Sequence, residues 1–414
     1  MSTFSRYQKF VVAVLAFLQF TIVLDFMILS PLGAILLRDL GIKTSQFGLV
    51  VSAYAFSAGF SGLLTAGFAD KFDRKKLLLF FYSGFVLGTF LCAAATSYAF
   101  LLGARVVTGL FGGVIGSIGF AIITDLFPLE TRGRVMGLVQ TAFAASQVMG
   151  IPVGLLLSNH YSWHAPFVLI GTVSLAVGFV IAVFLRPINA HLLIRSDRNP
   201  LRHFLHAFSV RAYLQGFAAT TLLATGGFML MPFGSAFTVH NLGIAVQRLP
   251  LIYLVTGLCS MVAGPLLGRL SDAIGKYVMF CIGSSVSVVL VGIYCNLGRT
   301  PIGVVMLLNA ILFSAIMSRI ISASALTSAV PAPADRGAYM AITSSLQQLS
   351  GGVASSVAGL IVFQASDGRI EHYDTLGYVV MIAIAVTVAM MYPIHLAVRE
   401  NIARKPSIAG ASVR

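Results

Sequence analysis

Apolar segments long enough to cross a lipid bilayer recur along almost the whole chain. A transmembrane helix needs roughly 20 mainly apolar residues, and such segments follow one another from residue 9 to residue 398. The 414 residues are 58% hydrophobic and only 10% charged, with a mean hydropathy of +0.93, whereas soluble domains carry about 25% charged residues. A soluble fold of this size could not bury so much apolar surface. The chain is therefore predicted to be an all-α integral membrane protein.

Polar residues between the apolar segments separate twelve candidate spans. They are predicted at residues 9–37, 46–69, 77–97, 99–125, 134–158, 164–185, 211–238, 249–270, 277–296, 301–327, 337–364 and 374–398. The longest polar stretch, residues 186–210, lies after the sixth of them. We therefore expect an N-terminal six-helix half over 1–185, a cytoplasmic linker over 186–210 and a C-terminal six-helix half over 211–414.

The lysines and arginines predict which way the spans run. With the N-terminus in the cytoplasm, 20 of the 27 basic residues fall in cytoplasmic segments, five fall in outer loops, and Arg105 and Arg319 lie within spans. Cytoplasmic loops of membrane proteins carry an excess of Lys and Arg. Both termini are therefore expected in the cytoplasm, with the chain in the inner (plasma) membrane. The net charge of +14 is attributed to contact with anionic lipid, and no nucleic-acid partner is expected.

Two loops of the first half have counterparts in the second. The sequence AGFADKFDRKK at 66–76 follows the second span, and GRLSDAIGKY at 268–277 follows the eighth, so that Asp70 corresponds to Asp272. Arg132-Gly133 after the fourth span likewise corresponds to Arg336-Gly337 after the tenth. Repetition at one offset of about 200 residues indicates an internal duplication, and parallel repeats of six spans are a known transporter architecture.

The loop at 66–76 is similar to the signature loop of the major facilitator superfamily. The matching residues are Asp70, Lys71, Phe72, Arg74, Lys75 and Lys76. Ala66 and Asp73 stand where the family has glycine, and Asp73 is expected to cap the third span. RVVTGLFGG at 105–113 resembles the fourth-span motif of the twelve-helix drug:proton antiporters and sugar-efflux permeases. GIPVG at 150–154 resembles their fifth-span motif loosely, with its proline displaced by one position.

This resemblance implies the major facilitator fold, in which two six-helix pseudo-repeats transport a small molecule by alternating access. The leading hypothesis is a proton-coupled exporter of small amphipathic molecules that acts as a monomer in contact with membrane lipid. A sugar or metabolite exporter, a proton symporter and a lipid transporter are the alternatives within transport. A non-transporting membrane receptor or sensor is the alternative from another class. No enzyme activity, metal or cofactor is expected, apart from the proton as coupling ion, because neither a nucleotide-binding loop nor a metal or nucleophile motif is present.

One carboxyl group is predicted to lie deep in the membrane. Twelve of the thirteen acidic residues fall in loops or at helix ends, and Asp25 alone lies well inside a span. At 1.5 Å per residue, Asp25 and Arg105 both lie roughly 21–22 Å from the cytoplasmic face. A carboxyl group whose surroundings change between inward and outward states can bind a proton on one side and release it on the other. Asp25 is therefore the predicted proton carrier, and Arg105 is predicted to modulate it or to bind substrate, with a static ion pair as the alternative.

Polar residues within the spans are candidates for the substrate cavity. The predicted set is Gln19, Tyr54, Gln140, Gln147, Tyr253, Asn309, Arg319 and Gln347. Arg319 could attract an anionic substrate or extend towards the cytoplasm.

Two further groups are expected to support the transport cycle. A cytoplasmic gate between the halves is predicted from Asp70, Arg74, Arg132 and Asp272, because the resemblance gives the Asp70 loop that role. Close helix packing is predicted from Gly150, Pro152, Gly154, Gly264 and Pro265, because small residues let membrane helices approach each other.

Overall fold

The computed structural model describes residues 4–65, 71–189, 192, 208–331 and 335–403, nearly all in helices. The first half contains α1 (Arg6–Ile28), α2 (Gly33–Asp39), α3 (Thr44–Thr65), α4 (Arg74–Ala93), α5 (Tyr98–Leu126), α6 (Leu129–Ala145), the π-helical turn η2 (Ser146–Gly150), α7 (Ile151–His160) and α8 (Ala165–Phe184). The second contains α10 (Arg211–His240), η4 (Val246–Arg248), α11 (Leu249–Ile274), α12 (Lys276–Cys295), α13 (Ile302–Thr327), α14 (Arg336–Ile361), β1 (Phe363–Gln364), β2 (Ile370–Glu371) and α15 (Tyr373–Ala403).

Eleven helices of the described chain are long and apolar enough to cross a membrane, if residues 134–160 through α6, η2 and α7 are taken as one. The all-helical membrane fold predicted from the sequence is thereby confirmed. α14 is 26 residues long, but its many serine and glutamine residues make it less apolar. It packs along α3 between the halves, where Ser356 Oγ donates a hydrogen bond to Ser52 Oγ at 2.8 Å. The total of twelve spans stays a prediction.

The first predicted span, 9–37, is wrong in its length. α1 ends at Ile28 and α2 begins only at Gly33, with a turn between them. Pro31 lies in this turn, and a proline both lacks an N–H donor and clashes with the preceding helical turn. The start of the third span follows the expectation, because the Asp73 side chain accepts a hydrogen bond from the Lys76 backbone N–H at 3.0 Å and caps α4.

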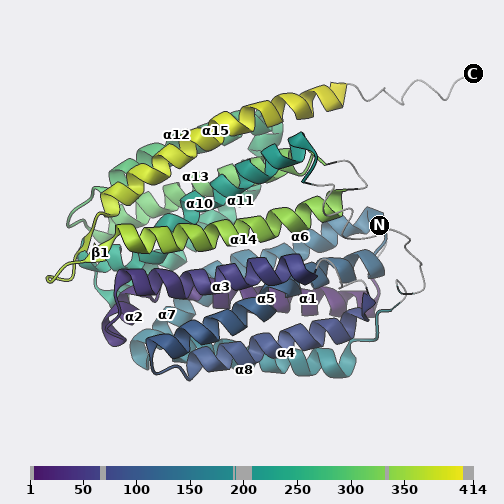
Figure 1. Cartoon of the computed structure of the whole chain (residues 1–414), viewed down its shortest axis with the longest axis horizontal. Coiled ribbons are helices and arrows are strands. Elements are labelled where there is room, and N and C mark those ends of the chain that lie inside the picture. The colour runs from purple at the N-terminus through teal and green to yellow at the C-terminus, as the bar shows by residue number, and fades with distance from the viewer. Residues whose placement is uncertain (1–3, 66–70, 190–191, 193–207, 332–334, 404–414) are drawn as a thin grey trace, which may run out of the picture.

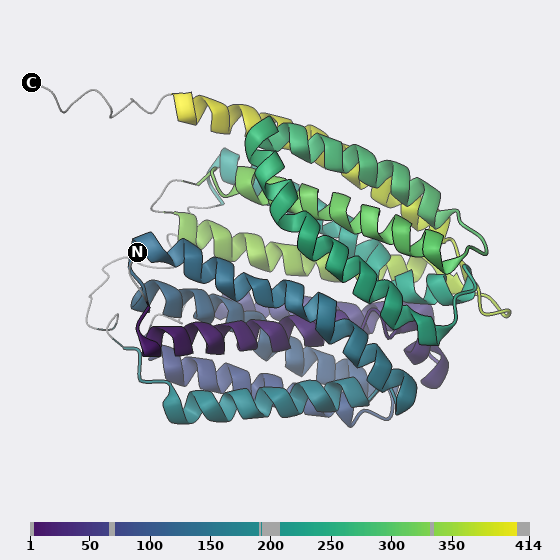
Figure 2. The same cartoon turned by 180° about the vertical axis from the view of Figure 1, so that it is seen from behind.

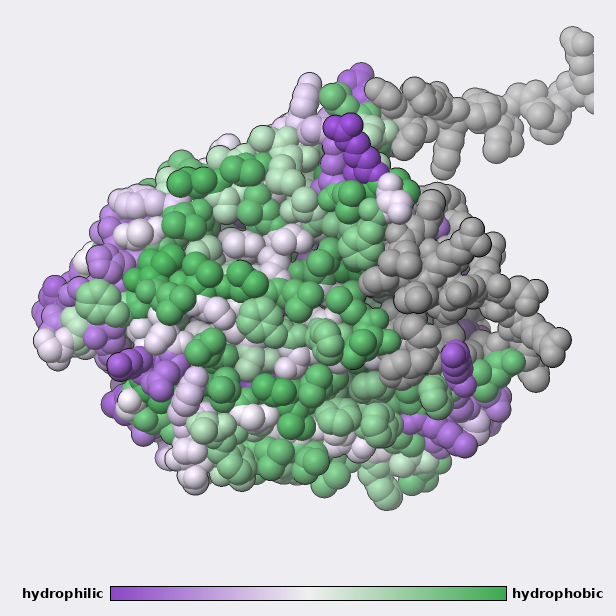
Figure 3. Space-filling view, in the orientation of Figure 1, coloured by the Kyte–Doolittle hydropathy of each residue, from purple (hydrophilic) through white to green (hydrophobic). Residues whose placement is uncertain are grey.

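The halves lie side by side, with both chain termini at the same end of the molecule (Figure 1). We call this the terminal end, and the end that carries α2 and β1 the distal end. α3 and α14 run together along the boundary on one side. On the other side, seen in Figure 2, α11 approaches η2 and α7. Apolar residues cover much of the visible surface between the ends, and hydrophilic residues gather near both ends (Figure 3), as expected of a protein in a bilayer.

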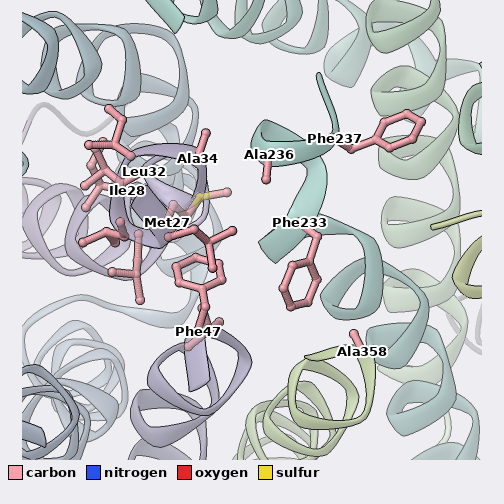
Figure 4. Close-up of a cluster of buried hydrophobic side chains, with 14 of the residues drawn as sticks. Met27, Ile28, Leu32, Ala34, Phe47, Phe233, Ala236, Phe237 and Ala358 are labelled. Atoms are coloured by element: carbon pink, nitrogen blue, oxygen red, sulfur yellow. The ribbon is translucent and has the colours of Figure 1, made fainter. Parts of the chain in front are cut away.

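The halves share a hydrophobic core at the distal end. Phe47 from the first half and Phe233 from the second have ring centroids 5.9 Å apart, and Leu32 and Ala236 belong to the same cluster (Figure 4). Ser235 Oγ also donates a hydrogen bond to the Ser30 carbonyl at 2.9 Å. At the terminal end the clusters of buried residues belong to one half or the other. The structure is therefore closed between the halves at its distal end.

Candidate functional site

A buried ion pair joins α1 to α5 inside the first half. Arg105 Nη1 donates hydrogen bonds to Asp25 Oδ2 at 2.8 Å and to the Asp25 carbonyl at 3.4 Å. The exposed fractions of the two side chains are 1% and 0%. The structure thus brings together the two residues that the sequence placed at one depth. Because so little solvent reaches the pair, its charges interact far more strongly than they would at a surface.

Other side chains complete the surroundings of the pair. Thr89 Oγ1 on α4 donates a hydrogen bond to Asp25 Oδ1 at 3.2 Å. The Arg105 guanidinium lies over the Tyr54 ring of α3, 4.6 Å from its centroid, a distance suited to a cation–π contact. Arg105 Nε is buried and has no hydrogen-bond partner in the described part of the chain. Thr89 could not be predicted from the sequence, because a threonine within an apolar helix carries no distinctive signal.

Glycines of the RVVTGLFGG segment bring α3 close enough for Tyr54 to reach Arg105. A Cβ atom at Gly109 would lie 2.4 Å from the Tyr54 carbonyl oxygen, and one at Gly112 would lie 2.8 Å from the Tyr54 hydroxyl. A side chain at Gly109 would therefore force α3 and α5 apart, and one at Gly112 would displace the Tyr54 ring. The same segment thus supplies both the guanidinium and the close approach that holds an aromatic ring over it.

Two predicted cavity residues line one shallow recess in the first half. Gln19 on α1 and Gln140 on α6 border it, together with residues of α5. Gln147 lies farther along in η2, where its Nε2 is 3.8 Å from the Met27 sulfur. In the second half, Asn309 Nδ2 donates a hydrogen bond to the Tyr294 hydroxyl at 3.5 Å. Tyr253 and Gln347 are half-buried on α11 and α14.

Arg319 lies apart from these residues. It is 5% exposed on α13, and its Nε donates a hydrogen bond to Ser284 Oγ on α12 at 3.1 Å. Its guanidinium is 5.9 Å from the centroid of the Phe280 ring. Both contacts lie within the second half, so the structure does not bring Arg319 to the Asp25–Arg105 pair. Its predicted contact with substrate stays a prediction.

The predicted gate residues make contacts within their own halves. Arg74 forms an ion pair with Asp125 at 3.1 Å, between the terminal ends of α4 and α5. Arg132 donates hydrogen bonds to the carbonyls of Thr124 and Phe127, at 2.7 and 2.9 Å, and so caps the end of α5. Asp272 near the end of α11 pairs with Lys276, the first residue of α12. Asp70 lies outside the described residues, so its predicted contact between the halves stays a prediction.

The predicted packing glycines Gly150, at the end of η2, and Gly154, in α7, lie against α1. A Cβ atom at either Gly150 or Gly154 would come within 2.6 Å of a side chain of α1, Leu24 and Ile28 respectively. Pro152 lies in the first turn of α7, directly after η2. Residues 134–160 run on as one helix, so the missing N–H of Pro152 removes one hydrogen bond to the preceding turn.

The structure does not show the close packing that was predicted at Gly264 and Pro265. Pro265 is exposed, and a Cβ atom at Gly264 would meet no atom within 4 Å. The close approach of α11 to the first half occurs two turns earlier, where a Cβ at Gly257 would be 3.1 Å from Val148 Cα. Gly264 and Pro265 lie beyond Gly257, on a part of α11 that does not approach the first half closely.

The chain matches one family of membrane transporters. A model described as Major Facilitator Superfamily matches residues 15–355. An uncharacterized MFS-type transporter of Bacillus subtilis, YceJ, is 28% identical over 62% of this chain and 66% of its own length. Multidrug resistance protein 3 of the same organism is 32% identical over 34% of this chain and 28% of its own. The matches thus span less than two thirds of the length of these relatives.

Solved structures share the fold over nearly the whole chain. A bacterial homologue of the human lysosomal transporter Spinster, in an inward-facing and unoccupied conformation, has a TM-score of 0.70 at 16% identity and covers 97% of this chain and 99% of its own. The nucleoside transporter NupG has a TM-score of 0.74 at 16% identity, covering 92% of this chain and 98% of its own.

Proposed function

Because the chain belongs to the major facilitator superfamily, we propose that it is a proton-coupled secondary transporter that exports small amphipathic molecules by alternating access. The observation that carries the proposal is the buried Asp25–Arg105 ion pair, with 2.8 Å between Oδ2 and Nη1. Ionisable groups inside a membrane are costly, and those that persist usually serve transport. In this proposal the protein acts as a monomer, and the proton is its only coupling ion.

A change in the surroundings of Asp25 would couple proton binding to transport. The carboxylate has its arginine and Thr89 as donors in the distally closed state. Movement of α1 relative to α5 would separate carboxylate and guanidinium, and the carboxyl group would then bind a proton to avoid burial as an isolated charge. Return of Arg105 would release the proton. This cycle needs only two positions of the pair, one for each state.

Alternating access is supported by the asymmetry of the contacts between the halves. The shared core lies at the distal end, whereas separate clusters occupy the terminal end. We propose that the terminal end faces the cytoplasm and the chain lies in the inner membrane, in keeping with the distribution of Lys and Arg. The distally closed structure would then be an inward-facing state, the conformation named for the Spinster homologue.

One relative favours an alternative direction of transport, which is uptake by proton symport. A vacuolar membrane amino acid uptake transporter of Schizosaccharomyces pombe is 34% identical to this chain over 142 residues, 24% of its own length. Proton symport would use the same buried pair and would move substrate in the same direction as the proton. A sugar or lipid transporter would differ only in its cavity, and a receptor would bind without moving its ligand.

Flux measured in proteoliposomes tests the proposal. The protein is reconstituted, a pH gradient is imposed, and movement of a panel of labelled amphiphiles, sugars and amino acids is followed. Export predicts that substrate moves against the direction of the proton, and that collapse of the gradient with a protonophore abolishes accumulation. Accumulation in the direction of the proton would establish symport. Binding without gradient-driven movement of any compound would contradict transport.

A further inference from the structure

Three aromatic rings connect the Asp25–Arg105 ion pair to the second half of the protein. The Arg105 guanidinium lies over the Tyr54 ring of α3, and the Phe26 ring of α1 contacts Tyr54 with 5.1 Å between the ring centroids. Phe26 in turn meets Phe228 of α10, with 5.7 Å between the centroids. Separations of this size are typical of attractive cation–π and aromatic contacts. A continuous series of contacts therefore runs from the guanidinium across the boundary between the halves.

Phe26 is linked to both members of the ion pair. It follows Asp25 directly in α1, so a shift of the helix at the carboxylate also moves the Phe26 ring. It also packs against Tyr54, the ring that lies over Arg105. Consecutive residues point about 100° apart around a helix, which lets the carboxylate reach α5 while the ring reaches α3 and α10. Separation of the pair would therefore change the position of Phe26 relative to Phe228.

Phe228 is held by two helices of its own half. It belongs to α10, and a Cβ atom at Gly351 of α14 would lie 2.9 Å from the Phe228 ring. Ser355 Oγ of α14 also donates a hydrogen bond to the Phe228 carbonyl at 3.1 Å. Gly351 and Ser355 are four residues apart and so lie on one face of α14. Phe228 therefore moves with the second half, and its contact with Phe26 depends on where that half lies.

The contact between Phe26 and Phe228 belongs to the distally closed state. Both residues are half-buried and pack against the distal core that the halves share. Opening at the distal end would part this core and, with it, the two rings. Phe26 would then be free to move with α1, and the carboxylate could leave the guanidinium.

We propose that Phe26 is a positioning residue that couples proton binding at Asp25 to opening of the distal end, through its contact with Phe228. The contact favours the closed state with the ion pair formed, and its loss favours the open state with a protonated Asp25. Such coupling is reciprocal, so proton binding promotes opening to the same extent as opening promotes proton binding. The inference rests on the proposed proton coupling, and it names the residue that connects this coupling to the movement of the halves.

The pH dependence of distal opening tests the inference. Spin labels at Lys43→Cys and Arg299→Cys, which are exposed positions at the distal ends of the two halves, report opening as a change in distance. The labels are placed in full-length protein whose four native cysteines have been replaced. We expect the ratio of open to closed molecules to rise about tenfold on acidification. A ratio that does not depend on pH would contradict proton coupling itself, and the inference with it.

Variants distinguish Phe26 from other contacts between the halves. Phe26→Leu keeps an apolar side chain without the ring and should lower the rise about fivefold, the contribution of one aromatic contact, whereas Phe26→Tyr should preserve the rise. Phe228→Leu should act as Phe26→Leu does, and the double variant should add nothing, because each change removes the same contact. Phe47→Leu is the matched control, because it removes a ring contact with Phe233 in the same distal core. It should shift the ratio at every pH and leave the rise unchanged.

Two outcomes would overturn the inference and leave proton coupling intact. One is a full rise on acidification in Phe26→Leu, in a protein whose parent shows that rise. The other is an equal loss of the rise in Phe47→Leu, which would show that Phe26 has no special part in it.

An infrared measurement separates coupling from maintenance of the ion pair. The carboxyl stretching band of protonated Asp25, identified by its absence in Asp25→Asn, is followed over the same range of pH. In Phe26→Leu the band should still appear on acidification, although the distal end no longer opens with it. Loss of this titration in Phe26→Leu would show that the ring only maintains the pair, and would overturn the proposed coupling role of Phe26.

Discussion

Asn309 occupies the place in the second half that Arg105 occupies in the first. The two residues are 204 positions apart, the offset that also separates Arg132 from Arg336. Each lies seven residues after the start of its helix, α5 or α13. Arg105 binds a carboxylate, whereas Asn309 binds the neutral hydroxyl of Tyr294. The two halves therefore carry a charged pair at this position in the first and a neutral contact in the second, and the proposed proton coupling belongs to the first half for that reason.

Asp25→Asn should abolish movement of substrate driven by a pH gradient. The amide has nearly the shape of the protonated carboxyl group but cannot exchange a proton, so binding and gradient-independent exchange should persist. The measurement is flux into proteoliposomes with binding assayed in parallel. Asp367→Asn, the same change at an exposed carboxylate, is the matched control and should retain gradient-driven flux. Full gradient-driven flux in Asp25→Asn would reduce the pair to a structural role.

Loss of Asp25 should lower the free energy of unfolding more than loss of Arg105. Asp25→Asn leaves Arg105 buried, and a guanidinium cannot release its proton in a protein, so we expect a cost of about 3 kcal/mol in the free energy of unfolding. Arg105→Gln leaves a carboxyl group that can bind a proton and so avoid burial as a charge, at a smaller cost. Thermal unfolding in detergent checks the order. The double variant should recover stability relative to Asp25→Asn, and equal losses in both single variants would contradict this account.

The ion pair at the terminal end should serve stability more than coupling. Arg74 and Asp125 are mostly buried, with side-chain exposures of 7% and 18%. We expect Asp125→Asn to lower the free energy of unfolding by on the order of 2 kcal/mol, less than for a fully buried pair. Asp367→Asn removes an exposed pair with Arg369 and should change stability by less than about 0.5 kcal/mol. Equal stability in the two variants would show that the Arg74 pair is solvated.

The sequence predicted the elements that depend on composition and periodicity. The spans follow from the length of apolar runs, the α4 cap follows from Asp73, and the common depth of Asp25 and Arg105 follows from a constant rise per residue. It could not predict the contacts that depend on how whole helices are placed. Thr89 reaches Asp25 only because α4 packs beside α1, and Arg319 points to α12 because of its rotation on α13.

The predictions that the structure contradicts failed because the placement of whole helices cannot be read from the sequence. Gly264 and Pro265 have the composition of a helix-packing surface, yet α11 meets the first half at Gly257 instead. A small residue permits a close approach but does not create one, and which stretch of α11 makes the contact depends on the placement of the two halves. Pro31 in the sequence indicates the break after Ile28, but the residues around it are apolar enough to predict one continuous span.

Fusion reporters test the proposed orientation. A reporter inserted after residue 200 or fused to the C-terminus should be cytoplasmic in both cases, because the Lys and Arg bias places these segments on the same side. A reporter between Gln364 and Ile370, in the connection between β1 and β2, should lie on the other side and serves as the control. An external signal from either of the first two fusions would overturn both the orientation and the arrangement of spans.

A cross-link at the distal end should stop transport reversibly. Ser235 Oγ donates a hydrogen bond to the Ser30 carbonyl at 2.9 Å, so cysteines at these two positions can be joined by a short bifunctional thiol reagent. The four native cysteines are first replaced, because Cys259 is exposed. Alternating access requires the distal contacts to open once per cycle, so we expect flux to be lost on cross-linking with a reagent that contains a cleavable disulfide, and regained on reduction. The single variant Ser235→Cys should be insensitive to the reagent, and undiminished flux through the fully cross-linked protein would rule out opening at the distal end.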